Sequence, residues 1–154
     1  MTRVDACRAG LVQVMFAALA AGAATAQDTV PLPPEPPVVT VTGPSVIAFW
    51  TVPASDSVLE ADPGLASALD DHQYWWSHAR EQLEAQGLAA LDQAGLQFEV
   101  QEPARRWSFA ADPDSAAVGF LFIAPGGIPH VEYGRRFPDE VLAVVRERFG
   151  NLRQ

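Results

Sequence analysis

A proline-rich stretch near the beginning of this chain limits which part of it can fold. Residues 28–44 hold six of the thirteen prolines in a sequence of 154 residues. Proline fixes φ and has no backbone donor, so this stretch can form neither a helix nor a central strand. We interpret residues 27–44 as an extended, flexible tether, with a ligand for a proline-binding module as the alternative. Residues 45–154 then form one globular domain, and about 110 residues are enough for a single core.

An apolar, alanine-rich segment precedes the tether. Arg3 and Arg8 lie before or at the start of this segment, and it ends in Ala-Thr-Ala at residues 24–26. A short apolar run followed by a small-x-small site predicts a secretory signal peptide, here cleaved after Ala26. The alternative is a buried or membrane-spanning helix, but the run is short for a bilayer. We therefore expect a periplasmic or secreted protein that is not inserted in a membrane after cleavage.

Cysteine content and charge exclude several functions. Cys7 is the only cysteine, so cleavage leaves a mature chain without disulfides, thiol catalysis or cysteine-bound metals. The net charge of the whole chain is −9, and removing residues 1–26, with two arginines and one aspartate, leaves −10. A chain with this negative charge is repelled by nucleic acid and by anionic membranes. Lysine is absent while alanine, arginine and proline are frequent, a composition typical of a GC-rich bacterial genome.

Hydrophobic patterns predict the elements of the domain. An N-cap at Asp62 with Pro63 after it indicates a helix start, and apolar side chains then recur every three or four residues. The first expected elements are a strand at 45–52, a loop at 53–62 and a helix that starts at 63. This helix ends at 87 or, in the preferred longer form, at about 95. A strand at 96–100 follows, then an irregular stretch at 101–116 with a helical turn at 103–109, strands at 118–124 and 129–133, and a helix at 138–149. This order predicts an α/β sandwich in which helices cover a mixed sheet.

Three stretches of the domain resemble the thioredoxin-like fold. Ile-Ala-Phe-Trp at 47–50 is similar to the strand before the thioredoxin active site, and LQFEVQEP at 96–103 to the next parallel strand. The stretch from residue 120 to 150 is similar to the closing hairpin and final helix. The resemblance implies a β-α-β-β-β-α sandwich. It carries no dithiol activity, because Ala54 and Ser57 stand at the cysteine positions and no proline precedes Val118 at the place of the family's cis-proline.

Histidines and acids on the first helix are candidates for an enzyme or a metal site. His72 and His78 are six residues apart, about 240° around a helix, and do not share a face. Asp71 and His78 do share one. The simpler interpretation places His72 in the core and leaves the acids in solvent. No catalytic serine motif or phosphate-binding glycine loop occurs, so we assign no catalytic residue, metal or cofactor.

Aromatic and arginine side chains are the candidates for binding. Tyr74-Trp75-Trp76 is a run of three, of which one helical face buries only one or two. Trp76 continues the core stripe, so Tyr74 or Trp75 is expected to be partly exposed, or covered by the 53–62 loop or the tether. Of these two, Trp75 is the candidate for binding a partner. Two pairs of adjacent arginines, one of them followed by a tryptophan, are expected to bind a protein or a small anionic partner, or else to form ordinary surface ion pairs. These residues are Arg105, Arg106, Trp107, Arg135 and Arg136.

These features favour an exported, non-redox binding protein with a thioredoxin-like domain. The first alternative is a hydrolase or metal-dependent enzyme that uses His72, His78 and nearby carboxylates. The second, which follows only from the resemblance, is a relic of a redox fold that supports conjugative or envelope assembly machinery. The partner and the oligomeric state are left open by the sequence.

Overall fold

A computed structural model describes residues 30–112 and 114–150. The predicted signal peptide with its cleavage site, and Cys7, lie outside the described residues. The strands are β1 (Val38–Thr40), β2 (Ser45–Trp50), β3 (Ala89–Ala94), β4 (Gln97–Gln101), β5 (Arg106–Ala110), β6 (Val118–Ile123) and β7 (His130–Tyr133). The helices are α1 (Asp56–Ala61), α2 (Pro63–Ala85) and α3 (Pro138–Phe149). None of these helices is long and apolar enough to cross a membrane.

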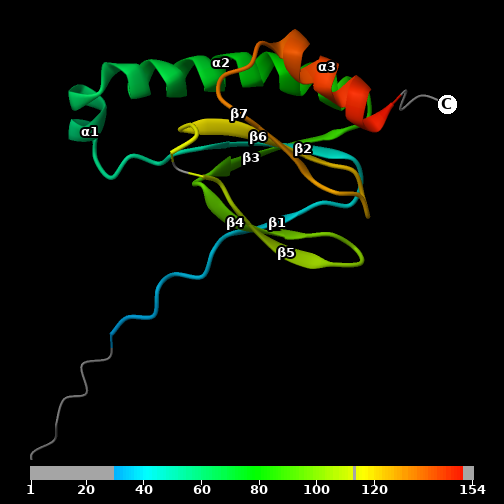
Figure 1. Ribbon diagram of the computed structural model, residues 1–154, viewed down its shortest axis with the longest axis horizontal. Helices are drawn as coiled ribbons and strands as arrows, with labels where there is room; N and C mark the ends of the chain where they lie inside the picture. Colours follow the sequence, from blue (N-terminus) through cyan, green and yellow to red (C-terminus); the bar gives the residue numbers. More distant parts are fainter. Residues whose placement is uncertain (1–29, 113, 151–154) are drawn as a thin grey trace, which may run out of the picture. The chain divides into compact units, whose positions relative to one another are not determined.

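The elements form three layers. A four-stranded sheet has the order β3-β2-β6-β7, and a three-stranded sheet has the order β1-β4-β5. In the larger sheet β2 is parallel to β3 and antiparallel to β6. Helices α2 and α3 cover one face of this sheet, and the three-stranded sheet lies below its other face (Figure 1). The predicted α/β class with a mixed sheet is confirmed, but helices cover one face only.

Strand β2 lies at the centre and contributes to two cores. Its side chains alternate, so Val46 and Ala48 pack toward the helices, in the first core, while Ile47 and Phe49 pack toward the three-stranded sheet, in the second core. All four are fully buried. A strand that is covered on both faces has a continuous apolar sequence, which is why this strand was predictable.

Both long helices begin where the sequence predicted. The carboxylate of Asp62 accepts a hydrogen bond from the N–H of Leu65 at 3.0 Å, and Pro63 is the first residue of α2. At α3 the carboxylate of Glu140 accepts from the N–H of Phe137 at 2.8 Å. These contacts satisfy backbone donors that the first helical turn leaves unpaired.

Helix α2 ends earlier than the preferred prediction. It stops at Ala85, and Gly87 follows with φ of +83°. The N–H of Gly87 donates to the carbonyl of Glu84, and the N–H of Leu88 donates to that of Leu83. This is a Schellman motif, in which a glycine in the left-handed region closes the helix. The shorter predicted helix, ending at Gly87, is therefore confirmed in place of the longer one.

The residues after this turn form a strand that the sequence assigned to helix. Strand β3 pairs in parallel with the whole of β2, from Ser45 opposite Ala89 to Trp50 opposite Ala94. A parallel partner across a helix was predicted, but it was placed at residues 96–100. The sequence AALDQA has low β propensity, so pairing with a buried neighbour, not local preference, determines its conformation.

The next residues form the antiparallel hairpin of the three-stranded sheet. The predicted strand at 96–100 is confirmed as β4. The predicted helical turn at 103–109 is wrong, because β5 occupies residues 106–109. Phe98 lies opposite Phe109 and Val100 opposite Trp107. These side chains pack toward the four-stranded sheet in the second core. Alternation along Arg106–Ala110 was the period-two signal for a strand.

The folded domain also begins earlier than predicted. Strand β1 lies inside the predicted tether and pairs in parallel with β4, with Val38 opposite Glu99. Val39 and Val41 are buried in the second core. Because β1 starts after Pro37 and lies at a sheet edge, its position agrees with the limits that proline imposes. The tether prediction is therefore wrong for residues 38–44.

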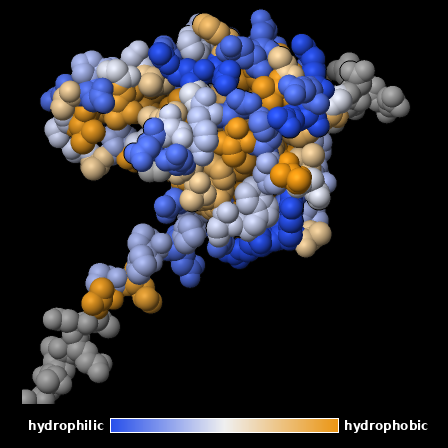
Figure 2. All heavy atoms as spheres, in the orientation of Figure 1, coloured by the Kyte–Doolittle hydropathy of each residue, from blue (hydrophilic) through white to orange (hydrophobic). Residues whose placement is uncertain are grey.

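Part of the predicted loop at 53–62 is the short helix α1. None of its residues is buried, and Val52 and Val58 beside and within it are 59% and 38% exposed. Figure 2 shows apolar residues around α1 at the left of the domain. Of the positions that were compared with the thioredoxin active site, Ser57 lies in α1, and Val118 pairs with Trp50 at the end of β2.

Gly119 occupies a position in β6 where no side chain fits. A Cβ atom there would lie 2.5 Å from the Phe49 ring and 2.7 Å from the backbone oxygen of Glu132. We expect Gly119→Ala to lower the free energy of unfolding by about 2 kcal/mol, because the clash forces a packed ring and a strand apart. Gly43→Ala is the matched control, since a Cβ at Gly43 meets nothing within 4 Å. Equal midpoints of urea unfolding for the two variants would contradict this prediction.

Candidate interaction surface

The three consecutive aromatic residues of α2 have different environments, because successive side chains point about 100° apart. Trp76 is 4% exposed and packs in the first core, where its indole N–H donates to Asp92. Trp75 is half-buried, and its ring lies 4.3 Å from that of Phe137. Tyr74 is 63% exposed and its ring lies 4.7 Å from that of His78. The cover over Trp75 is thus the start of α3, and not the 53–62 loop or the tether.

An ion pair joins the same part of α2 to the segment before α3. Arg135 Nη1 lies 2.6 Å from Asp71 Oδ2, and both side chains are partly exposed. Asp71 is four residues before Trp75, so the two side chains are neighbours on one side of the helix. We call the group formed by Tyr74, Trp75, His78, Arg135 and Phe137 the aromatic surface.

Arg136 does not join the aromatic surface. Its guanidinium donates to Glu132 Oε2 at 2.8 Å, and the other oxygen of Glu132 lies 2.6 Å from His130 Nε2. Arg136 is therefore held along β7, although its neighbour Arg135 contacts α2. Adjacent residues outside a helix point in different directions, so the doublet in the sequence does not become one cationic site.

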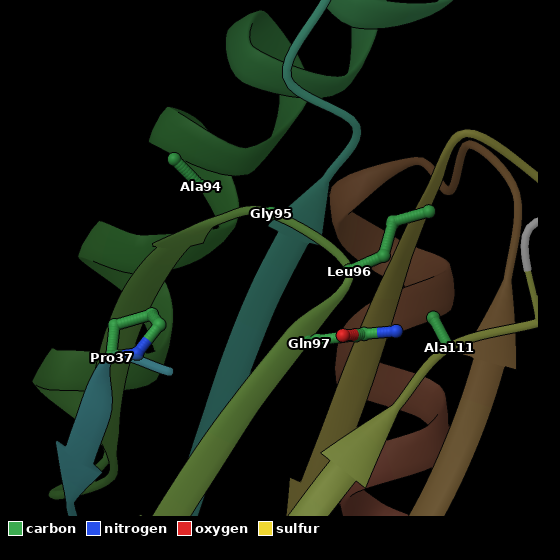
Figure 3. A pocket seen from close by; sticks show the side chains of 6 residues that line it. All are labelled: Pro37, Ala94, Gly95, Leu96, Gln97 and Ala111. Carbon is green, nitrogen blue, oxygen red and sulfur yellow. The ribbon is translucent and has the colours of Figure 1, made fainter. Parts of the chain in front are cut away.

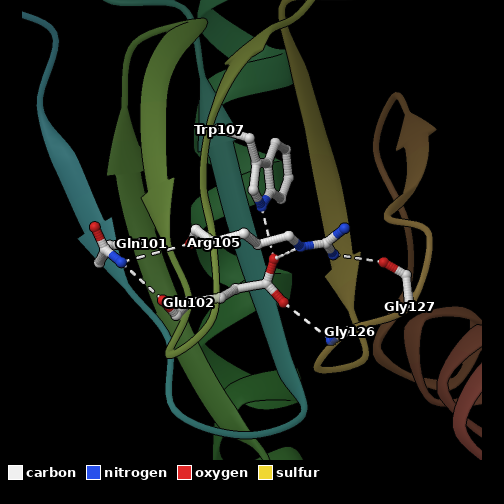
Figure 4. Close-up of polar contacts among 6 residues, drawn as sticks. All are labelled: Gln101, Glu102, Arg105, Trp107, Gly126 and Gly127. Carbon is white, nitrogen blue, oxygen red and sulfur yellow. Dashed lines mark hydrogen bonds and ion pairs between the residues drawn. The ribbon is translucent and has the colours of Figure 1, made fainter.

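Arg105 of the other doublet contacts a buried carboxylate at the opposite end of the domain. Glu102 is 3% exposed and accepts from the guanidinium of Arg105, from the indole N–H of Trp107 at 2.7 Å and from the N–H of Gly126 at 3.2 Å (Figure 4). Arg105 also donates to the carbonyl of Gly127 at 2.5 Å. The β4–β5 turn is thus tied to the β6–β7 turn.

These contacts determine the ionisation of Glu102. Burial alone raises the pKa of a carboxyl group, because it disfavours the charged form. Here the hydrogen bonds from Arg105, Trp107 and Gly126 outweigh burial and hold the pKa of Glu102 below its ordinary value. The carboxylate therefore stays charged, and its role in this geometry is structural.

The two doublets do not come together as one binding site for a small anion. Arg105 contacts Gly127, beyond the last residue of β6, whereas Arg135 follows Gly134, which bonds the first residue of β6. Six strand residues, roughly 20 Å, separate these ends. Each of the four arginines already has a carboxylate partner, and these partners are Glu102, Glu99, Asp71 and Glu132.

The two histidines of α2 lie on different sides of the helix, as the spacing predicted. His72 is 1% exposed, and neither ring nitrogen has a hydrogen-bond partner. The centroid of its ring lies 4.9 Å from the ring centroid of Phe120 and 6.1 Å from that of Trp50. His78 is exposed, with Nδ1 2.9 Å from the carbonyl oxygen of Tyr74. Across residues 30–112 and 114–150, no three histidine, cysteine or acidic side chains cluster as metal ligands.

Burial also sets the ionisation of His72. Desolvation lowers its pKa to about 4, and the negative charge of Asp92 on β3 offsets only part of this effect. His72 is therefore neutral at pH 7. Because its side chain is 1% exposed, the ring is closed off from a ligand in solvent.

Two shallow grooves lie along the three-stranded sheet. The larger, of about 430 Å³, is shown in Figure 3 and is lined by Pro37, Ala94, Gly95, Leu96, Gln97 and Ala111. The smaller, of about 290 Å³, is lined by Pro36, Gln97, Phe98, Ser108, Phe109 and Ala110. Neither lining contains a charged side chain or a histidine, so neither groove offers groups for acid–base catalysis.

The chain matches no protein-family model, no curated protein and no solved structure. The assignment of a site therefore depends on the geometry alone. Sequence reasoning identified Trp75 and Arg135, which the structure brings to one surface. It missed Phe137 and Glu102. Phe137 was visible in the sequence as a large apolar residue immediately before Pro138, the first residue of the predicted helix.

Proposed function

We propose that this chain is an exported, non-redox protein of the bacterial periplasm that binds a partner protein through its aromatic surface. The observation that carries the proposal is the exposure of Tyr74 and Phe137. Among the described aromatic residues, these two are exposed by more than half. Exposed aromatic side chains beside an arginine are typical of residues that anchor a protein partner.

The order of the elements supports the thioredoxin-like part of this proposal. Strands β2 and β3 are parallel and connected through α2, and β6 and β7 continue the sheet as an antiparallel hairpin followed by α3. This is the order that the resemblance implied for the sheet and its helices. The departure is the three-stranded sheet on the other face. Without cysteine in the mature chain, such a domain acts by binding and not by thiol exchange.

The proposed binding is tested by comparing capture of periplasmic proteins on immobilised wild-type chain and on variants. We expect Tyr74→Ala and Phe137→Ala each to weaken capture of a partner about tenfold or more, because each removes a large exposed ring. Both side chains are more than half exposed, so the fold is expected to tolerate their removal. Captured proteins are identified and quantified by mass spectrometry.

Ile128→Ala provides the matched control for this experiment. Ile128 is 94% exposed and lies in the β6–β7 turn, away from α2. A partner that depends on the aromatic surface is captured normally by this variant. If all three variants capture the same proteins in the same amounts as the wild type, the proposed surface is wrong.

A further inference from the structure

The chain carries its own candidate ligand for an aromatic surface. Five of the seven residues from Pro31 to Pro37 are proline, and all seven are exposed. The carbonyl of Pro37 accepts from the N–H of Glu99 at 2.8 Å, and β1 begins at the next residue. Proline holds φ near −65°, so such a segment is already extended and loses little entropy when it binds.

The aromatic surface has the groups that recognise such a segment. Proline-rich segments bind to surfaces lined by aromatic rings, where proline rings pack against the aromatic faces. Tyr74 and Phe137 are more than half exposed and offer such rings, and Trp75 packs against Phe137 beside them. The Tyr74 hydroxyl and the Trp75 indole N–H bond no other group in the described part of the chain. They are therefore available to donate to the carbonyls of a segment whose prolines have no N–H of their own.

Charge also matches between the two. The segment has one charged residue, Glu35, at its centre. Arg135 on the aromatic surface is 46% exposed in its ion pair with Asp71. A second carboxylate can share a guanidinium, which has five donors. The mature chain is otherwise strongly acidic, so Arg135 is the group on the aromatic surface that attracts the Glu35 carboxylate.

The fold separates Pro36 and Pro37, at the end of the segment, from the aromatic surface of the same molecule. Pro36 and Pro37 lie beside the three-stranded sheet, where they line the two grooves. The aromatic surface lies on the helical layer, and the four-stranded sheet lies between (Figure 1). A segment of six residues from Pro31 to Pro36 spans at most about 19 Å in an extended polyproline form and is attached at its far end to β1.

We propose that the aromatic surface binds the proline-rich segment 31–37 of a second copy of this chain. This inference rests on the proposed function, since it uses the same surface, and it adds the identity of the partner. Each molecule offers one segment and one surface, so the contact is heterologous and association increases with concentration.

Complementation between two variants of the full chain tests the proposal. In the first variant Pro33, Pro34 and Pro36 are replaced by serine, which leaves the surface intact. In the second, Tyr74→Ala and Phe137→Ala remove the surface and leave the segment. We expect each variant alone to associate at least about tenfold more weakly than the wild type in sedimentation velocity. Mixed together, the two are expected to form a heterodimer, because one supplies the surface and the other the segment.

A peptide control separates this inference from the proposed function. The peptide VPLPPEPPV is expected to bind the wild-type chain, and a peptide with its prolines replaced by alanine is expected to bind at least about tenfold more weakly. A wild-type chain that stays monomeric and binds neither peptide would overturn the inference. After that result, the proposed function would still hold if Tyr74→Ala abolishes capture of a different protein. If Tyr74→Ala leaves capture unchanged, the proposed function would be wrong as well. Association of the serine variant at wild-type strength would also overturn the inference.

Discussion

Replacing Glu102 with alanine is expected to lower the free energy of unfolding by about 3 kcal/mol. The carboxylate is 3% exposed and accepts hydrogen bonds from Arg105, Trp107 and Gly126. Its removal leaves these donors without an acceptor, and the cost of unpaired polar groups adds to the lost contacts. The Arg105 side chain is 38% exposed and regains some hydration, so we expect a value near the lower end for buried ion pairs. Urea unfolding with an unchanged m value measures the difference.

Glu99→Ala is the matched control in the neighbouring position of the same hairpin. Glu99 forms an ion pair with Arg106, whose side chain is 56% exposed. Exposed pairs of this kind contribute about 1 kcal/mol or less, so the control should lose much less stability. If the two substitutions cost the same, Glu102 does not tie the β4–β5 turn to the β6–β7 turn in the way that its contacts indicate.

The parts of the fold that were predictable are those in which local sequence and tertiary packing agree. Strand β2 is apolar throughout because both of its faces are buried. Helices α2 and α3 begin at a proline and carry capping carboxylates in Asp62 and Glu140. These signals are local, so they can be interpreted without knowing what the element packs against.

The parts that were not predictable depend on partners far away in the sequence. Strand β3 has an alanine-rich sequence and becomes a strand because β2 offers a complete row of backbone partners. Strand β1 follows a run of prolines and is ordered by pairing with β4, about 60 residues later. A single sequence contains no direct signal for such pairings, and local preference pointed to helix or tether instead.

The candidate site shows the same division. Helical periodicity predicted that Tyr74 or Trp75 is partly exposed or covered by another segment, and Tyr74 is 63% exposed. The separation of Arg135 from Arg136 depends on Asp71 and Glu132, which lie on α2 and β7. Ion-pair partners are chosen by the packing of whole elements, so two adjacent arginines give no information about where each will point.

Acidification is expected to destabilise the protein through His72. Its pKa of about 4 in the folded state lies below the value of about 6.5 in an unfolded chain, because burial disfavours the charged ring. Between these values the unfolded state binds more protons than the folded state. Stability from this group is therefore complete above about pH 6.5 and is lost as the pH falls toward 4. The full loss corresponds to about 3 kcal/mol, measured as the free energy of unfolding in urea at a series of pH values.

His72→Phe separates this effect from the titration of carboxylates. A phenylalanine ring suits a site between Phe120 and Trp50, and it has no proton to bind. The variant should therefore lose less stability than the wild type between pH 6.5 and 4, while the carboxylates contribute equally to both. His78→Gln, on the exposed side of the same helix, should keep the wild-type dependence. The sharpest contradiction would be a His72→Phe profile parallel to that of the wild type, since the ring would then have a hydrated or paired environment and α2 would not be closed over it. A difference confined to this pH range would instead show that an unpaired imidazole in the first core limits the stability of the helical layer that presents the aromatic surface.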